Sequence, residues 1–177
     1  MSTKLRNISI ALSVAGLLAL VACQSMEQGT GQKASASLES RSGSKAKGDV
    51  TFTWQGSDVL INGSFSGLKP NSEQGFHVHE KGDCSAPDAT SAGGHFNPET
   101  KSHGMPNSGM NHAGDLPNIK SDANGNATYT AKLHGFAVNN GPSGILGRSV
   151  VVHRDPDDYK SQPAGNSGPR IACGLIK

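Results

Sequence analysis

The sequence is poor in aromatic residues, in charged residues and in long apolar runs. Aromatic residues make up 5% and charged residues 17% of the 177 residues. The nine prolines follow no period, which excludes a collagen-like chain and a simple proline-rich linker. No stretch carries a 3.6-residue apolar stripe of helical length, so a helical bundle is not expected either. The length predicts one domain, with at most an added tail.

A net charge is also almost absent. Lys and Arg total 16 against 14 Asp and Glu, a formal charge of +2. Two of the bases, Lys4 and Arg6, lie in residues 1–22, which contain no acid and which we expect to be removed. The mature chain would then be neutral. A neutral chain has no general attraction to nucleic acid, and no nucleic-acid partner is expected.

Glycine is abundant, and many glycines lie between short strand-like segments. The chain has 23 glycines, about 13% against an average near 7%. Alternating or apolar short runs predict strands over residues 34–40, 49–54, 59–65, 75–80, 127–133, 149–153 and 171–176. Between them lie two long segments without regular pattern, 81–117 and 154–169, and loops of this length usually carry function. The pattern predicts an all-β, antiparallel sandwich or barrel with two functional loops.

The amino terminus has the features of a bacterial export signal. Lys4 and Arg6 precede an apolar run over residues 8–22, which is shorter than the ~20 residues of a membrane-spanning helix. The run ends in Leu-Val-Ala-Cys, which resembles a lipobox with Cys23 as the acylated first residue of the mature protein. The alternative is ordinary cleavage near Ala22, with Cys23 a free thiol. We therefore expect a lipoprotein signal peptide at 1–22, a lipidated polar tether at 23–33 and one domain at 34–177.

Export also bears on the other two cysteines. Once Cys23 is assigned to lipid, Cys84 and Cys173 remain as an even pair in an oxidising compartment, where a disulfide is expected. The alternative is two free thiols.

The histidines are the main chemical signal. His77 and His79 are two apart on a predicted strand, so their rings lie on one face, and His153 on a distant strand could join them at one metal. His103, His112 and Asp115 lie in the first long segment, and such a nitrogen and oxygen set suits tetrahedral zinc. Sets made only of imidazole favour copper, zinc, iron or nickel over magnesium or calcium. The spacing therefore predicts metal binding.

Several blocks of the sequence, taken in order, resemble the copper/zinc superoxide dismutases. They are GFHVHE at 75–80, GDC at 82–84, SAGGHFNP at 91–98, HAGDL at 112–116, GRSVVVH at 147–153 and GNSGPRIACG at 165–174. With the export signal, the chain resembles the bacterial, envelope-anchored form. The resemblance implies an eight-stranded antiparallel Greek-key β-barrel and an enzyme that converts superoxide to dioxygen and hydrogen peroxide. It further implies one copper and one zinc per subunit.

The resemblance also assigns roles to residues. His95 would bridge the two metals and carry a proton, and Arg170 would dock the substrate anion beside copper. A carboxylate linking the two metal sites would be Asp157 or Asp158, and the count from His153 favours Asp157. Cys84 and Cys173 would form the family disulfide. The implied ligand sets are His77, His79, His95 and His153 for copper, and His95, His103, His112 and Asp115 for zinc.

Two other functions are alternatives to the enzyme. One is a non-enzymatic lipoprotein that binds copper and zinc in the envelope, and the other is an interaction domain that uses the barrel only as a scaffold. The complete copper set together with Arg170 favours the enzyme. The expected location is the bacterial envelope, facing the periplasm and attached only through the lipid. The outer membrane is favoured because Gln24 is not Asp. The oligomeric state stays open between monomer and homodimer.

Overall fold

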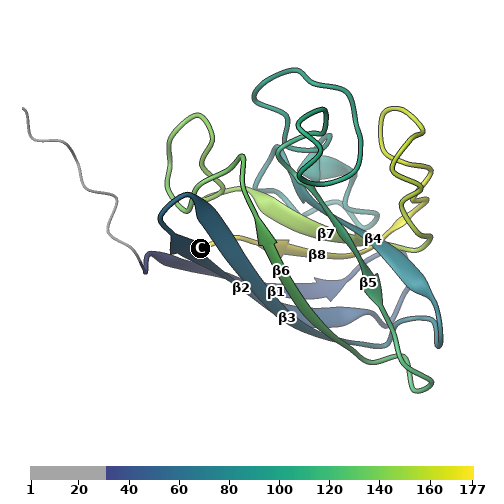
Figure 1. The fold of residues 1–177 in the computed structure, drawn as a ribbon. Coiled ribbons are helices and arrows are strands. Elements are labelled where there is room, and N and C mark those ends of the chain that lie inside the picture. The colour runs from purple at the N-terminus through teal and green to yellow at the C-terminus, as the bar shows by residue number, and fades with distance from the viewer. Residues whose placement is uncertain (1–30) are drawn as a thin grey trace, which may run out of the picture.

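The computed structural model describes residues 31–177, and the expected signal peptide and Cys23 lie outside that range. Eight β-strands and one 3-10 turn make up its regular structure (Figure 1). The strands are β1 Lys33–Ser40, β2 Lys47–Gln55, β3 Asp58–Ser66, β4 Glu73–His79, β5 Asp115–Lys120, β6 Ala127–Leu133, β7 Ser149–His153 and β8 Arg170–Leu175. The 3-10 turn, η1, spans Thr90–Ala92. Within residues 31–177 no helix has the length and apolar character needed to cross a bilayer.

All strand pairs are antiparallel, and together they form a nearly closed barrel. The strands follow the order β5-β4-β7-β8-β1-β2-β3-β6. The connections from β3 to β4 and from β6 to β7 therefore cross between distant positions in the sheet, which is the Greek-key arrangement. The edge strands β5 and β6 close the barrel through side-chain contact: the Tyr129 hydroxyl on β6 donates a 3.1 Å hydrogen bond to the carbonyl oxygen of Pro117 on β5. The predicted eight-stranded Greek-key class is confirmed.

One strand was missed by the sequence pattern. The segment 81–117 was expected to be loop throughout, but its last residues, from Asp115, begin β5. Pro117 interrupts the strand signal, yet β5 lies at the edge of the sheet, where a proline costs no ladder hydrogen bond. The pairing of β5 with β4 also shifts register between Gln74 and Phe76, so simple alternation does not continue across it.

The core is the apolar interior of the barrel. Phe65, Phe76 and Tyr129 pack edge to face, with ring centroids 5.2–6.4 Å apart. This is the preferred geometry for aromatic pairs. Further aromatic residues and smaller apolar residues, from the strands and from the loops, fill the rest of the interior.

Strands β4 and β7 are buried on both faces, and this positions the functional side chains. On β4, Phe76 and Val78 belong to the barrel core, so the alternating His77 and His79 face outward. They are nevertheless fully buried. The cover comes from the two long loops, residues 80–114 and 154–169, which rise over the same side of the barrel (Figure 1).

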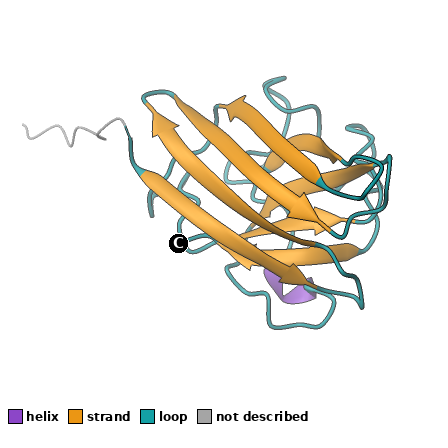
Figure 2. Ribbon diagram, turned by 90° about the horizontal axis from the view of Figure 1, so that it is seen from below, coloured by secondary structure: helices purple, strands orange, loops and turns teal. Residues whose placement is uncertain are grey.

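The first loop is attached to the barrel by a disulfide between Cys84 and Cys173 on β8. Cys173 and Val151 form a second small apolar cluster with Ala89 and Ala92. The turn η1, which holds Ala92, lies outside the strands (Figure 2). The outer wall of the barrel therefore has a packed cover of its own, and the histidines lie beneath it.

Candidate metal centre

Two buried groups of potential metal ligands adjoin each other under the loops and share His95. Within each group the ligand atoms all lie within 4.8 Å of one another. The first group is His77, His79, His95 and His153, and the second is His95, His103, His112 and Asp115. The structure thus brings together every residue that the sequence analysis placed in the copper and zinc sets.

In the first group, main-chain carbonyls fix the orientation of two rings. The Nδ1 of His79 lies 3.0 Å from the carbonyl oxygen of Gly93, and the Nδ1 of His153 lies 3.1 Å from that of Gly168. A carbonyl can only accept, so both Nδ1 atoms carry the proton and both Nε2 atoms keep a lone pair. These two Nε2 atoms lie 3.3 Å apart. They point to a common position, as ligands of one metal do.

Two further ring nitrogens in this group are buried without a hydrogen-bond partner within residues 31–177: Nδ1 of His77 and Nε2 of His95. An unpartnered buried polar atom is costly. A metal ion would use both lone pairs. The chemistry of the donor set, four imidazole nitrogens, also fits copper.

In the second group, three rings converge on one carboxylate oxygen. The Nδ1 atoms of His95, His103 and His112 lie 2.9, 3.0 and 3.3 Å from Oδ1 of Asp115. Ligands about 2.0 Å from a tetrahedral centre are about 3.3 Å from one another. The observed separations match the edges of such a tetrahedron, so the three nitrogens and one oxygen fit zinc.

Asp115 is held in place through its other oxygen. Its Oδ2 accepts hydrogen bonds from the backbone N–H groups of Gly104 and His112, at 3.1 and 2.8 Å. Burial favours the neutral acid, but hydrogen bonds from His103, His112 and His95 outweigh it and hold the pKa of Asp115 well below its usual range. The carboxylate is therefore ionised at neutral pH, as a metal ligand must be.

Asp157 joins the two groups. Its Oδ2 accepts a 2.8 Å hydrogen bond from Nε2 of His77, and its Oδ1 accepts a 2.9 Å bond from Nε2 of His103. Asp158, the alternative from the sequence, is exposed and bonds Ser161 and Asn166 instead. One carboxylate thus orients a ring in each group, which is the usual function of an outer carboxylate at a metal site.

Burial leaves most of the rings neutral. Desolvation holds the pKa values of His79 and His153 well below 6.5, and the mutual repulsion of the clustered rings adds to it. Desolvation also lowers the pKa of His95 to about 4, and it lowers that of His77 despite the bond to Asp157. At neutral pH each of these four rings is therefore uncharged and keeps one nitrogen with a lone pair that is available to a metal.

A pocket opens onto the first group. It is lined by His79, His95, His112, His153, Arg170, Glu80, Gly94, Asn97, Pro163 and Ala164. The guanidinium of Arg170 is held by two 2.6 Å hydrogen bonds, to the carbonyl oxygens of Ala89 and Gly93. A fixed cation at the mouth of a small pocket suits the docking of a small anion.

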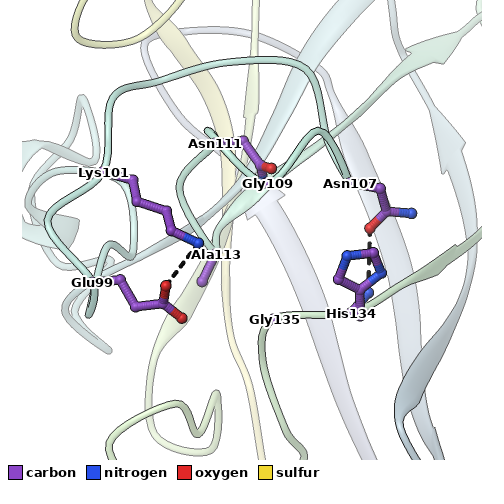
Figure 3. Close-up of a pocket in the computed structure, with 8 residues that line it drawn as sticks. All are labelled: Glu99, Lys101, Asn107, Gly109, Asn111, Ala113, His134 and Gly135. Carbon is purple, nitrogen blue, oxygen red and sulfur yellow. Dashed lines mark hydrogen bonds and ion pairs between the residues drawn. The ribbon is translucent and has the colours of Figure 1, made fainter.

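The seventh histidine, His134, lies apart from both groups. It borders a separate pocket with Asn107, whose side-chain oxygen accepts a 3.3 Å hydrogen bond from the backbone N–H of His134 (Figure 3). On the opposite side of that pocket, Glu99 and Lys101 form an ion pair of 2.7 Å (Figure 3). His134 lies outside the sequence blocks that predict the metal ligands, and it belongs to neither ligand group in the structure.

Sequence reasoning did not find the groups that hold the ligands. The carbonyls of Gly93 and Gly168 orient two rings, and main-chain atoms leave no signal in a sequence. The side chains of Asn118 and Gln162 bind the main chains of Asp157 and His103. Asn and Gln are common in loops, so their identity alone does not single them out.

The fold and site together define a class: a Greek-key β-barrel metalloprotein with two adjacent metal sites that share one histidine. The comparisons with known proteins agree with this class. Residues 46–176 match the family described as copper/zinc superoxide dismutase (SODC). Two superoxide dismutases (Cu-Zn) of Aquifex aeolicus (strain VF5) are similar to the chain. Number 1 is 44% identical over 149 residues, covering 82% of this chain and 88% of the relative. Number 2 is 47% identical over 125 residues, covering 68% and 73%.

A solved structure, that of the clock protein EA4, matches with a TM-score of 0.74 and 42% identity, covering 84% of this chain and 95% of that one. The chain belongs to the copper/zinc superoxide dismutase family. It is an oxidoreductase whose substrate is superoxide and whose cofactors are copper and zinc.

Proposed function

We propose that His77, His79, His95 and His153 hold the catalytic copper and that His95, His103, His112 and Asp115 hold the zinc. The observation that carries this assignment is the position of His95. Its Nδ1 lies 2.9 Å from Asp115 in the second group, and its Nε2 is buried without a partner beside the first. One imidazole with its two nitrogens directed to two ligand groups is suited to bridge two metals.

Copper, when bound, supplies the alternating one-electron chemistry that zinc cannot, because zinc has no accessible second oxidation state. The protein's part is to hold the rings still. His77 and His79 are fixed on β4 and His153 on β7, and each ring has one nitrogen bonded to a carbonyl or carboxylate. The Nε2 of His95, when free of metal, is the atom that can hold a proton for the product.

Arg170 docks the substrate in this proposal. Its two hydrogen bonds to Ala89 and Gly93 use the guanidinium edge toward the first loop. Its charge borders the same pocket as His79, His95 and His153. An anion entering this pocket therefore meets a fixed positive charge beside the copper ligands.

The test uses the mature protein loaded with one equivalent each of copper and zinc. Superoxide decay is followed directly by pulse radiolysis for the loaded protein, a zinc-only sample and the His153→Ala variant. We expect fast decay only in the loaded wild type. A wild-type rate of decay in the His153→Ala variant would overturn the copper assignment. Tight binding of both metals without accelerated decay would instead favour a chain that binds metal without catalysis.

We also propose that the protein is a lipoprotein of the bacterial envelope that faces the periplasm, with lipid on Cys23 as its attachment. The lipobox-like Leu-Val-Ala-Cys at 20–23 and the bacterial source of the two Aquifex relatives support this. Mass spectrometry of the protein expressed in a bacterial host should find a diacylglyceryl group on Cys23, and Cys23→Ser should remove it and release the protein from the membrane fraction. Cleavage with an unmodified Cys23 would contradict the proposal.

Analytical ultracentrifugation of the mature protein decides between monomer and homodimer.

A further inference from the structure

We infer that Gln162 is a positioning residue that attaches the wall of the substrate pocket to the loop that holds zinc. The inference deepens the proposed function, because it rests on the assignment of His103 as a zinc ligand. It concerns a side chain that touches neither metal ligand ring nor substrate.

The side-chain amide of Gln162 binds both main-chain groups of His103. Its Oε1 accepts a 2.9 Å hydrogen bond from the N–H of His103, and its Nε2 donates a 2.9 Å bond to the carbonyl oxygen of His103. The same Nε2 lies 3.3 Å from the carbonyl oxygen of Lys160. An amide that pairs with the N–H and C=O of one residue imitates a strand pair. It fixes both the position and the orientation of that residue's main chain.

The next residues along the chain form part of the substrate pocket. Pro163 and Ala164 line it together with His95, His153 and Arg170. A displacement of Gln162 from His103 would therefore move the pocket wall directly. No other residue intervenes in sequence between the amide pair and the wall.

The loop 154–169 is held at a second point by a similar amide. The side chain of Asn118, on β5, accepts from the N–H of Asp157 at 2.9 Å and donates to the carbonyl oxygen of Asp157 at 3.0 Å. Asn118 thus ties the start of the loop to the barrel, whereas Gln162 ties its middle to the zinc loop. Only the second attachment depends on the zinc loop being ordered. Zinc, by fixing His103, would order residues 161–168 through Gln162.

The contact that Gln162 makes with His103 is distinct from the one that Asp157 makes. The Asp157 carboxylate binds the His103 ring at Nε2, and Gln162 binds the His103 main chain. Loss of Gln162 should therefore release residues 161–168 while the loop around Asp157 stays attached. Because Gln162 is exposed, its replacement should not unfold the barrel.

The test compares Gln162→Ala, Gln162→Glu and the control Lys160→Ala, an exposed neighbour, in the copper- and zinc-loaded mature protein. Zinc release to an excess of a chromogenic chelator is timed, and amide hydrogen exchange is measured with and without zinc. We expect release on the order of tenfold faster in both Gln162 variants and an unchanged rate in Lys160→Ala. Alanine loses both hydrogen bonds to His103, whereas glutamate keeps the acceptor for the N–H of His103 and loses the bond to its carbonyl oxygen. Glu keeps the length of Gln but places an oxygen against the carbonyl of His103, so a role in packing alone would leave Gln162→Glu like wild type.

In wild type, zinc should slow exchange across 154–168. In Gln162→Ala this protection should be lost in peptides over 161–168 and kept around Asp157. Zinc-dependent protection of 161–168 that survives in Gln162→Ala would overturn the inference. His103→Ala is included as a reference: if it still binds zinc as wild type does, the zinc assignment itself fails, whereas zinc loss in His103→Ala with wild-type behaviour of Gln162→Ala overturns only the role of Gln162.

Discussion

The guanidinium of Arg170 and a ring nitrogen of His79 bind the same carbonyl oxygen, that of Gly93, at 2.6 and 3.0 Å. The cation proposed to dock substrate and a proposed copper ligand are therefore both bonded to a single atom of the first loop. Glu80 holds this loop segment in turn, because its Oε1 accepts a 3.2 Å hydrogen bond from the N–H of Gly94. The distance between docking charge and copper ligand is thus set by the main chain of one short segment.

Arg170→Lys should lower the rate of superoxide decay at low ionic strength by about tenfold, because the positive charge loses its fixed position beside the pocket. Lysine keeps the charge but lacks the forked donor that binds the carbonyls of Ala89 and Gly93 together. Arg170→Gln, which removes the charge, should be slower still and less dependent on salt. Pulse radiolysis across a range of ionic strength provides the measurement. A wild-type rate in Arg170→Lys at every ionic strength would show that the fork is unimportant.

Asp157→Asn should weaken zinc binding by about 10- to 100-fold, the usual effect of losing a carboxylate that orients a ligand. Asparagine keeps the size of aspartate but can accept from only one of the two rings, His77 and His103, and presents N–H to the other. Competition with a chelator of known affinity gives the constant. Asp158→Asn is the matched control, because that carboxylate contacts neither ring. Equal zinc affinity in the two variants would contradict the role given to Asp157.

Gly165→Ala should disturb the hydrogen bond between Asp157 and the ring of His103 by steric contact. Gly165 has φ +61°, and a Cβ there would collide with Oδ1 of Asp157 and lie 2.8 Å from Nε2 of His103. The variant should bind zinc about tenfold or more weakly. Gly43→Ala is its control, since Gly43 has φ +71° but open space around a Cβ. That variant should show only the cost of a Cβ in the left-handed region, about 1–2 kcal/mol of stability, with zinc affinity intact.

Zinc binding should release about one proton near pH 7.5. Burial alone would lower the pKa of His103, but its hydrogen bonds to Asp115 and Asp157 raise it to about 9. A raised pKa means that the metal-free ring is protonated below pH 9, and zinc needs Nδ1 without its proton. His95 and Asp115 contribute no proton at this pH, because the pKa of each lies well below it.

Zinc affinity should therefore rise about tenfold per pH unit up to pH 9 from His103 alone. Calorimetry at pH 7.5 in two buffers of different ionisation enthalpy counts the protons. A binding heat that is the same in both buffers would contradict the assignment.

How far the sequence predicts the molecule depends on the kind of contact. Seven strands can be predicted from alternation and glycine-rich turns, because successive side chains of a strand point to opposite faces of the sheet. β5 cannot, because Pro117 and the register shift beside Phe76 hide the same signal. The seven proposed ligands lie in sequence blocks that resemble those of the family. The atoms that orient these residues cannot be predicted from the sequence. The Gly93 carbonyl is a main-chain group, and Gln162 has a role only because the fold places it next to His103.

The separation of the two faces of β4 has a consequence for how such a chain can evolve. Phe76 and Val78 build the interior, while His77 and His79 lie on the outer wall under the loops. The core residues and the proposed metal ligands thus lie on the same strand but pack against different parts of the protein. Substitutions that abolish the chemistry leave the interior intact, and drift in the interior leaves the ligand set in place. A lineage descended from this barrel can lose its histidines and still inherit a folded scaffold with two long loops ready for another use.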